Sequence, residues 1–205
     1  MKLKVCGMRD PENISALVSL QPDYMGFIFW SSSSRYVDRE TPKLPESIKK
    51  TGVFVNASLD YIQSTIEDHE LKAVQLHGEE SPAYCSIVSE FDVEVIKAFS
   101  IQKQFDFNSL HPYENSCDYY LFDTKGPLPG GNGYTFDWTV LKEYTERKPF
   151  FLSGGIGPDQ LDEICGLINT KLPLHAIDVN SKFERSPGLK NIELLEPFKN
   201  QLDEL

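Results

Sequence analysis

Eight short apolar segments recur along the chain at intervals of about 20 to 30 residues, and this periodicity restricts the fold most strongly. Most are apolar throughout their centres, as strands covered on both faces of a parallel sheet are. They cover residues 2–7, 24–29, 51–56, 73–78, 93–99, 119–124, 149–155 and 175–181. The interval has room for one strand and one crossover helix, which predicts repeating βα units.

Helix-start signals lie in most of the connecting segments. Asp10-Pro11 and Ser81-Pro82 each pair an N-cap residue with proline at the first helical position. Further starts are expected at Ser58, Asp137 and Pro158 and in the C-terminal segment, whereas residues 100–117 show the weakest helical pattern. Eight strand–helix units predict a single domain over residues 1–205, a small α/β (β/α)8 TIM barrel with a weak or missing helix after strand 5. An open doubly wound sheet is the alternative, and no G-x-G-x-x-G follows any strand.

Composition limits the partners and the compartment. The 205 residues include 20 basic and 31 acidic side chains, a net charge of −11, which argues against nucleic acid and anionic membrane surfaces. The longest apolar run is far too short to span a bilayer. Four cysteines lie far apart without a C-x-x-C pair, and no histidines have metal-ligand spacing. We therefore expect a cytoplasmic protein without a metal or cofactor, and a monomer, with a homodimer as the alternative.

Polar residues end several of the predicted strands, and in a barrel the carboxyl ends of the strands form the active site. Cys6, His77, Asp123 and Asp178 occupy such positions, and Arg35 follows the second strand. Taken singly, each of these residues has an ordinary structural explanation. A cysteine in a strand is often a small core residue, an aspartate often caps a helix or a loop, and an arginine often lies on the surface. His77 alone is explained equally well as a strand-end histidine whose hydrogen bonds are satisfied. Together they predict one site.

Two glycine-rich segments follow the sixth and seventh strands. Gly154-Gly155-Ile156-Gly157 precedes a helix, and barrel loops after strands 7 and 8 often bind phosphate through backbone N–H groups. This would let an acidic protein hold an anionic substrate without a basic patch. Residues 130–133, Gly-Gly-Asn-Gly, are expected to form a loop that closes over the substrate.

In their order along residues 2 to about 191, these motifs resemble the phosphoribosylanthranilate isomerase family. They are KVCG (4–7), GFIFWSSSSRYV (26–37), VQLHGE (74–79), FDT followed by GGNG (122–133), LSGGIGPD (152–159) and DVNSKFE with PGLKN (178–191). The resemblance implies a small (β/α)8 barrel that carries out a cofactor-free Amadori rearrangement of N-(5'-phosphoribosyl)anthranilate in tryptophan biosynthesis.

The resemblance also implies residue roles. Cys6 corresponds to the general base and Asp123 to the general acid. Arg35 corresponds to the partner of the anthranilate carboxylate, and Asp178 to a carboxylate near the anthranilate nitrogen. His77 is grouped with the substrate-binding residues. Gly154, Gly155 and Ser181 correspond to the phosphate-binding loops. Asp123 would have to carry a proton, as a carboxyl does when burial or a neighbouring carboxylate disfavours its charge. No activator of Cys6 is evident.

The sequence departs from the family pattern at Ser34, Asn132, Asn180 and Lys182. Ser34 is expected to loosen the Arg35 loop, and Lys182 to be strained if its φ is positive. Three alternatives remain: the related ProFAR isomerase, disfavoured because strand 1 ends in Cys and not Asp; a metal-dependent epimerase, which would need more strand-end histidines; and a catalytically silent binding barrel.

Overall fold

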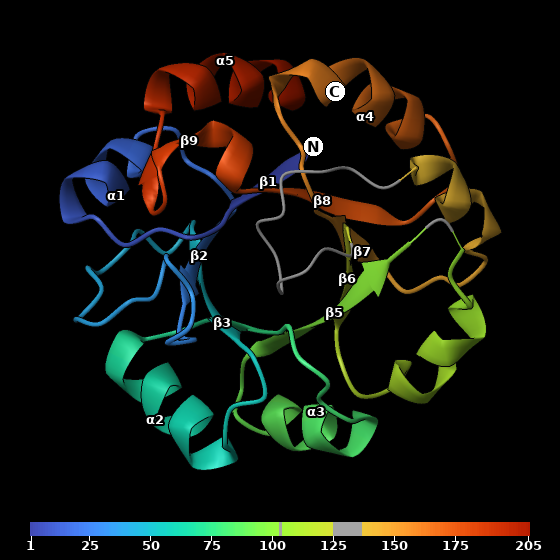
Figure 1. The fold of residues 1–205 in the computed structure, drawn as a ribbon, viewed down its shortest axis with the longest axis horizontal. Coiled ribbons are helices and arrows are strands. Elements are labelled where there is room, and N and C mark those ends of the chain that lie inside the picture. The colour runs from blue at the N-terminus through green and yellow to red at the C-terminus, as the bar shows by residue number, and fades with distance from the viewer. Residues whose placement is uncertain (103, 125–136) are drawn as a thin grey trace.

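Eight parallel strands close into a barrel in the computed structural model, which describes residues 1–102, 104–124 and 137–205. The strands follow one another around the barrel in chain order, and helices surround them (Figure 1). Their bounds are β1 Lys2–Val5, β2 Tyr24–Ile28, β3 Lys49–Phe54, β4 Ala73–Leu76, β5 Glu94–Ile101, β6 Tyr119–Thr124, β7 Phe150–Leu152 and β8 Leu174–Val179. The predicted barrel is confirmed, and each strand overlaps its expected segment, extending up to two residues beyond it in β3, β5 and β8.

Pairing between the first and last strands closes the barrel. Lys4 of β1 lies opposite Asp178 of β8, and Val5 lies opposite Val179. The amide of Cys6 continues this register by donating to the carbonyl of Val179 at 2.9 Å. The register therefore brings Cys6 next to the end of β8, although the two segments lie at opposite ends of the sequence.

Helices form where the cap signals predict them, with two differences. The α-helices are α1 Pro11–Val18, α2 Leu59–His69, α3 Pro82–Ser89, α4 Leu161–Ile168 and α5 Ile192–Asp203. The weak segment after β5 forms only the 3-10 helix η1 (Phe107–Tyr113), and the helix expected from Asp137 is the 3-10 helix η2 (Trp138–Glu143). Within the described residues, no helix lies between β2 and β3, a connector in which no helix-start signal was found, so the strand–helix pattern is incomplete there.

Short 3-10 helices and a hairpin follow the last two strands. They are η3 Pro158–Gln160 after β7, then η4 Ser181–Phe183 and the antiparallel pair β9 Glu184–Ser186 and β10 Leu189–Lys190 after β8. Gly188 between β9 and β10 has φ +83°, in the left-handed region that glycine adopts readily. These elements surround the carboxyl ends of the strands.

Two apolar cores stabilise the barrel, one on each face of the sheet. The larger lies between the strands and the outer helices and includes Leu17, Ile62, Val88, Ile164 and Leu202. The smaller fills the barrel interior with Tyr24, Ala73, Ile96, Ala98, Leu121, Phe151 and Ala176. Burial on both faces explains why most strands are apolar throughout and do not alternate.

Polar groups gather at the amino ends of the strands. The Tyr24 hydroxyl lies 3.2 Å from a Glu94 carboxylate oxygen and 3.0 Å from Nε2 of His175, and Lys49 pairs with Glu94.

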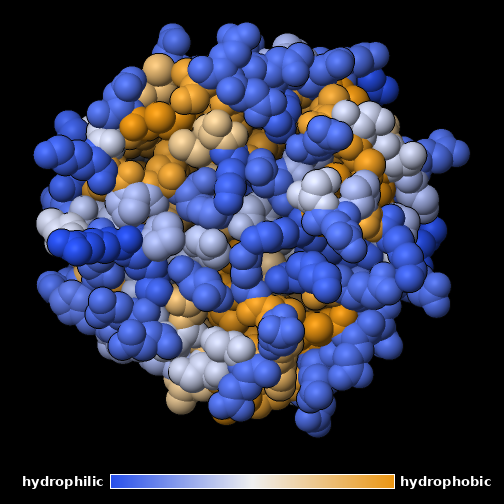
Figure 2. Space-filling view, turned by 180° about the vertical axis from the view of Figure 1, so that it is seen from behind, coloured by the Kyte–Doolittle hydropathy of each residue, from blue (hydrophilic) through white to orange (hydrophobic). Residues whose placement is uncertain are grey.

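The side of the molecule facing away from the viewer in Figure 1 is mainly hydrophilic, with scattered hydrophobic patches (Figure 2). Among the described residues, no helix has both the length and the hydropathy needed to cross a membrane.

A buried ion pair holds the loop after β4. Nζ of Lys97 lies 3.0 Å from Oε2 of Glu80, both side chains are 2 % exposed, and the ammonium also donates to the carbonyl of Gly78 at 2.8 Å. Glu80 in turn accepts from the amides of Asn56 and Gly78 at 2.9 Å. The pair thus fixes the backbone that follows His77.

Replacing Lys97 by Met is expected to lower the free energy of unfolding by about 3–5 kcal/mol, because Glu80 would stay buried without its cation. Urea unfolding of the two proteins measures the difference. Lys43→Met is the matched control, since Lys43 pairs with Glu70 while 84 % exposed and its loss should cost less than about 1 kcal/mol. Equal losses in the two variants would show that the buried pair does not stabilise the loop.

Candidate active site

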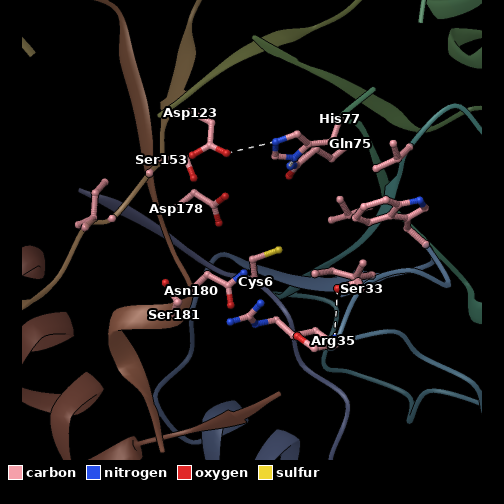
Figure 3. Close-up of a pocket in the computed structure, with 18 of the residues that line it drawn as sticks. Cys6, Ser33, Arg35, Gln75, His77, Asp123, Ser153, Asp178, Asn180 and Ser181 are labelled. Carbon is pink, nitrogen blue, oxygen red and sulfur yellow. Dashed lines mark hydrogen bonds and ion pairs between the residues drawn. The ribbon is translucent and has the colours of Figure 1, made fainter. Parts of the chain in front are cut away.

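The carboxyl ends of seven strands, all except β5, surround one pocket. It encloses about 860 Å³ of space, counted together with its open mouth. Its polar lining residues include Cys6, Arg35, Gln75, His77, Asp123, Ser153, Asp178, Asn180 and Ser181, and Gly154 and Gly155 complete the wall after β7. Every residue assigned to the site from the sequence therefore lies here (Figure 3).

The Cys6 thiol and the Asp123 carboxyl point into this pocket from opposite sides (Figure 3). Cys6 is a free cysteine and is 5 % exposed; Asp123 is 3 % exposed. Burial raises the pKa of the Cys6 thiol, and the ammonium groups of Lys4 and Lys190 oppose that rise. A proton donor and a proton acceptor can therefore face one small molecule bound between them.

Lys4 provides a buried cation beside Cys6. Its Nζ lies 3.0 Å from Oδ1 of Asp178 and donates to Oε1 of Gln75 at 2.8 Å. Burial alone would lower the pKa of Lys4, but its interactions with Asp178 and Cys6 together outweigh that effect and raise the pKa. Lys4 therefore carries its charge inside the barrel, and Asp178 is held in place at the pocket wall.

His77 connects the β4 side of the pocket with Asp123. Its Nδ1 lies 2.7 Å from the amide nitrogen of Gln75, and its Nε2 lies 3.2 Å from Oδ2 of Asp123. Oδ1 of Asp123 accepts a hydrogen bond from the amide of Thr124 at 2.9 Å. His77 thus contacts Asp123 directly, and both carboxyl oxygens have a hydrogen-bond partner.

Arg35 is positioned by a carboxylate that the sequence did not single out. Its Nε and Nη2 donate to Glu184 at 2.9 and 2.7 Å, and Lys190 binds the same carboxylate at 2.6 Å. These hydrogen bonds raise the pKa of Arg35, and Arg35 and Lys190 lower that of Glu184 against the effect of burial. Among the described residues Nη1 has no hydrogen-bond partner, so one edge of the guanidinium remains for a ligand.

The loop that carries Arg35 is held by local hydrogen bonds. The hydroxyl of Ser33 accepts from the amide of Arg35 at 3.1 Å, and Arg9 donates to the carbonyl of Ser34 at 3.2 Å. Gly7 has φ +77°, and a Cβ there would come within 2.7 Å of Cδ of Arg35. The close approach of this arginine to β1 therefore requires glycine at position 7. Ser34 is part of a pinned loop, and the loosening expected there is not observed.

The segment after β7 forms an open backbone loop. Gly154 and Gly155 have φ +95° and +68°, which favour glycine. Within the described part of the chain, the backbone N–H groups of Gly154, Gly155 and Ser181 make no hydrogen bond, an arrangement suited to an anion. Lys182 lies in η4 without a positive φ and is exposed, so the strain considered for it is absent. The GGNG segment and Asn132 lie outside the described residues.

Gly154→Ala is expected to reduce both stability and activity. A Cβ at this position would lie 2.5 Å from the amide nitrogen of Thr124 and 2.8 Å from Oδ1 of Asp123. The backbone strain should cost about 1–3 kcal/mol of unfolding free energy, and displacing Asp123 should lower kcat about 100-fold. Thermal unfolding and turnover measure the two effects.

Gly166→Ala in α4 is its control. No atom lies within 4 Å of a Cβ at Gly166, so this variant should match or slightly exceed wild-type stability and keep its activity. A Gly154→Ala protein that kept wild-type kcat would show that the Asp123 position tolerates the added methyl group.

The described residues contain no group of three or more His, Cys, Asp or Glu side chains placed to hold a metal ion. Sequence reasoning missed Lys4 and Glu184 as partners of the site residues. Both could have drawn attention, because a charged residue within or next to an apolar strand is costly to bury unless it is paired.

A closed barrel whose mouth combines a thiol, a carboxyl, an arginine and a glycine-lined loop after β7 is typical of barrel enzymes that act on small phosphorylated molecules. Residues 3–201 match the family model described as N-(5'phosphoribosyl)anthranilate (PRA) isomerase. The chain belongs to this family.

Individual relatives agree with this assignment. The chain is 43 % identical over 202 residues to the N-(5'-phosphoribosyl)anthranilate isomerase of Phocaeicola vulgatus, covering 98 % of each chain. It matches the crystal structure of the Thermotoga maritima phosphoribosyl anthranilate isomerase with a TM-score of 0.87 at 31 % identity, over the full length of both chains. Another such isomerase, crystallised with reduced 1-(o-carboxyphenylamino)-1-deoxyribulose 5-phosphate, matches with a TM-score of 0.83 at 28 % identity, also over the full length of both chains.

Proposed function

We propose that the chain converts N-(5'-phosphoribosyl)anthranilate to 1-(2-carboxyphenylamino)-1-deoxyribulose 5-phosphate by an Amadori rearrangement, with Asp123 as general acid and Cys6 as general base. The observation that carries the proposal is that these two side chains lie on opposite sides of one pocket. The family assignment and the reduced product bound by a relative support this substrate.

Ring opening is the first step. Asp123 donates a proton to the ribose ring oxygen while the aniline nitrogen supplies electrons to C1, which gives a Schiff-base cation. The carboxylate left on Asp123 is stabilised by the amide of Thr124 and by its contact with His77. When the enolamine formed in the second step becomes the ketone, its C2 hydroxyl gives a proton to this carboxylate and C1 takes a proton from the Cys6 thiol, which returns both groups to their starting states.

Proton abstraction from C2 is the second step. The Cys6 thiolate takes this proton, and the Schiff-base cation becomes an enolamine. Because burial raises the pKa of Cys6, the thiolate is a minor species in the free protein. Lys4, Lys190 and the positive charge formed on ring opening all favour the thiolate at the step that requires it.

Three groups would hold the substrate across the pocket. The free edge of Arg35 binds the anthranilate carboxylate, Asp178 lies near the anthranilate nitrogen, and backbone N–H groups of Gly154, Gly155 and Ser181 bind the phosphate. This assignment explains how a chain of net charge −11 binds a substrate with two anionic ends, since the positive and N–H groups are local to the pocket.

Arg35→Ala is expected to raise KM about 10- to 100-fold with a smaller effect on kcat, because one charge-assisted contact to the carboxylate would be lost. Steady-state kinetics and titration with the reduced product measure the change. Arg185→Ala is the control, since Arg185 pairs with Glu193 on the surface while 56 % exposed. Weakened binding of inorganic phosphate alone would contradict the assignment of Arg35 to the anthranilate end.

We also propose that residues 1–205 act as one barrel domain and as a cytoplasmic monomer, with a homodimer as the alternative. The excess of 31 acidic over 20 basic side chains supports a monomer through repulsion between copies. Light scattering at micromolar concentration distinguishes a mass of 23.3 kDa from twice that value.

Turnover of N-(5'-phosphoribosyl)anthranilate tests the function. The substrate is labile and would be generated in situ, and loss of anthranilate-type fluorescence would be followed with EDTA present. We expect enzyme-dependent loss that EDTA does not affect. A folded protein without turnover would overturn the proposal, and inhibition by EDTA would overturn the metal-independent mechanism.

A further inference from the structure

A row of hydrogen-bonded side chains crosses the pocket wall from β1 to β6. Lys4 contacts Gln75 at 2.8 Å, Gln75 contacts Nδ1 of His77 at 2.7 Å, and Nε2 of His77 contacts Asp123 at 3.2 Å. Lys4 is 0 % exposed and Gln75 is 1 % exposed, so water does not compete for the contact between them. His77, Gln75 and Asp123 lie together at one side of the pocket (Figure 3).

The chemistry of these groups sets the direction of every hydrogen bond. An ammonium has donors only, so the Gln75 atom facing Lys4 must be its carbonyl oxygen. The Gln75 atom facing His77 is then the amide nitrogen, which also has donors only, and Nδ1 of His77 must accept. A proton on Nδ1 would set two donors against each other at 2.7 Å.

We propose that Gln75, oriented by Lys4, holds His77 in the neutral tautomer whose proton is on Nε2. His77 is then a fixed hydrogen-bond donor to Asp123 and neither an acid nor a base. Gln75 and Lys4 act as positioning residues, because they reach Asp123 only through His77. The role rests on the proposed function, in which Asp123 loses its proton to the ring oxygen and a donor at Oδ2 stabilises the carboxylate formed.

The tautomer can be measured without turnover. The full chain, labelled with ¹⁵N in its histidine rings, would be studied by two-bond ¹H–¹⁵N correlation spectra at one neutral pH, which distinguish the two neutral tautomers and the cation. The chain has four histidines, and His77→Asn identifies the signals of His77 by their disappearance. We expect Nε2 of His77 to be protonated and Nδ1 to be bare.

Two substitutions of Gln75 test what fixes this state. Gln75→Glu places a carboxylate acceptor opposite Nδ1, so we expect Nδ1 to become protonated and kcat to fall about 10- to 100-fold with a much smaller change in KM. Gln75→Met removes the donor at similar volume, and we expect a mixture of tautomers and a smaller loss of kcat. Unchanged signals from His69, His111 and His175 report in the same spectra that each variant is folded.

Three results would overturn the inference: a wild-type His77 with a proton on Nδ1, a His77 spectrum unaffected by both Gln75 variants, or a changed tautomer with wild-type kcat. The proposed function fails separately, because a wild-type protein without turnover could still show the Nε2–H tautomer. Conversely, normal turnover with the other tautomer would refute the inference and leave the function intact.

Discussion

Replacing Cys6 by Ser is expected to lower kcat about 10²–10⁴-fold, the usual contribution of a general base. A serine hydroxyl fits the same space but stays protonated at neutral pH, so the C2 proton would have no acceptor on this side of the pocket. Binding of the reduced product, measured by fluorescence titration, should be nearly unchanged because the phosphate and carboxylate contacts do not involve the thiol.

A second cysteine provides the control for that substitution. Cys165 lies in α4, is partly exposed and does not line the pocket, so Cys165→Ser should keep wild-type kcat and Kd. If Cys6→Ser kept most of the activity, the base would be another group. If it lost binding and turnover together, the substitution would have damaged the pocket, and the role of the thiol would need a less disruptive variant such as Cys6→Ala.

Asp123→Asn is expected to lower kcat by a similar factor of about 10²–10⁴, because an amide cannot give a proton to the ribose ring oxygen. The shape of the side chain is kept, and the amide oxygen can still accept from Thr124 at the position of Oδ1, whereas the amide nitrogen replaces Oδ2 and loses the hydrogen bond with His77. Ring opening should therefore become rate-limiting while the reduced product still binds. Single-turnover kinetics would show slow formation of the first intermediate.

Asp60→Asn is the matched control, since Asp60 is exposed in the first turn of α2 and changes the net charge by the same amount. An Asp123→Asn protein with wild-type single-turnover kinetics would exclude Asp123 as the acid. A loss confined to Kd would instead make Asp123 a binding group.

The barrel could be predicted from the sequence because its strands are covered on both faces, which makes the apolar segments continuous and easy to find. Cap residues such as Asp10, Ser58 and Ser81 predicted helix starts, and each accepts a hydrogen bond from its first turn. The helix expected from Asp137 is a short 3-10 helix, because only six residues separate its cap from Tyr144, whose buried ring packs against Phe122 and Phe150. Two turns of 3-10 helix span that distance.

The residues that meet at the site could be predicted because they lie at strand ends, but the ion pairs that hold them in place could not. Cys6, Asp123 and Asp178 each end a strand, and strand ends meet in a barrel whatever their distance in sequence. Lys4 and Asp178 are 174 positions apart, and Arg35 and Glu184 are 149 positions apart. No local spacing links such residues, so their pairing depends on the register of the closed barrel.

The ion pair between β1 and β8 also bears on when the protein can become functional during synthesis. Lys4 leaves the ribosome 174 residues before its counter-charge Asp178. Until β8 has been synthesised, the Lys4 ammonium group beside Cys6 has no carboxylate partner inside the barrel. An unpaired ammonium group is more stable in water than buried. The nascent chain therefore carries the Cys6 thiol long before β8 exists, but it can complete the pocket only once β8 has been translated.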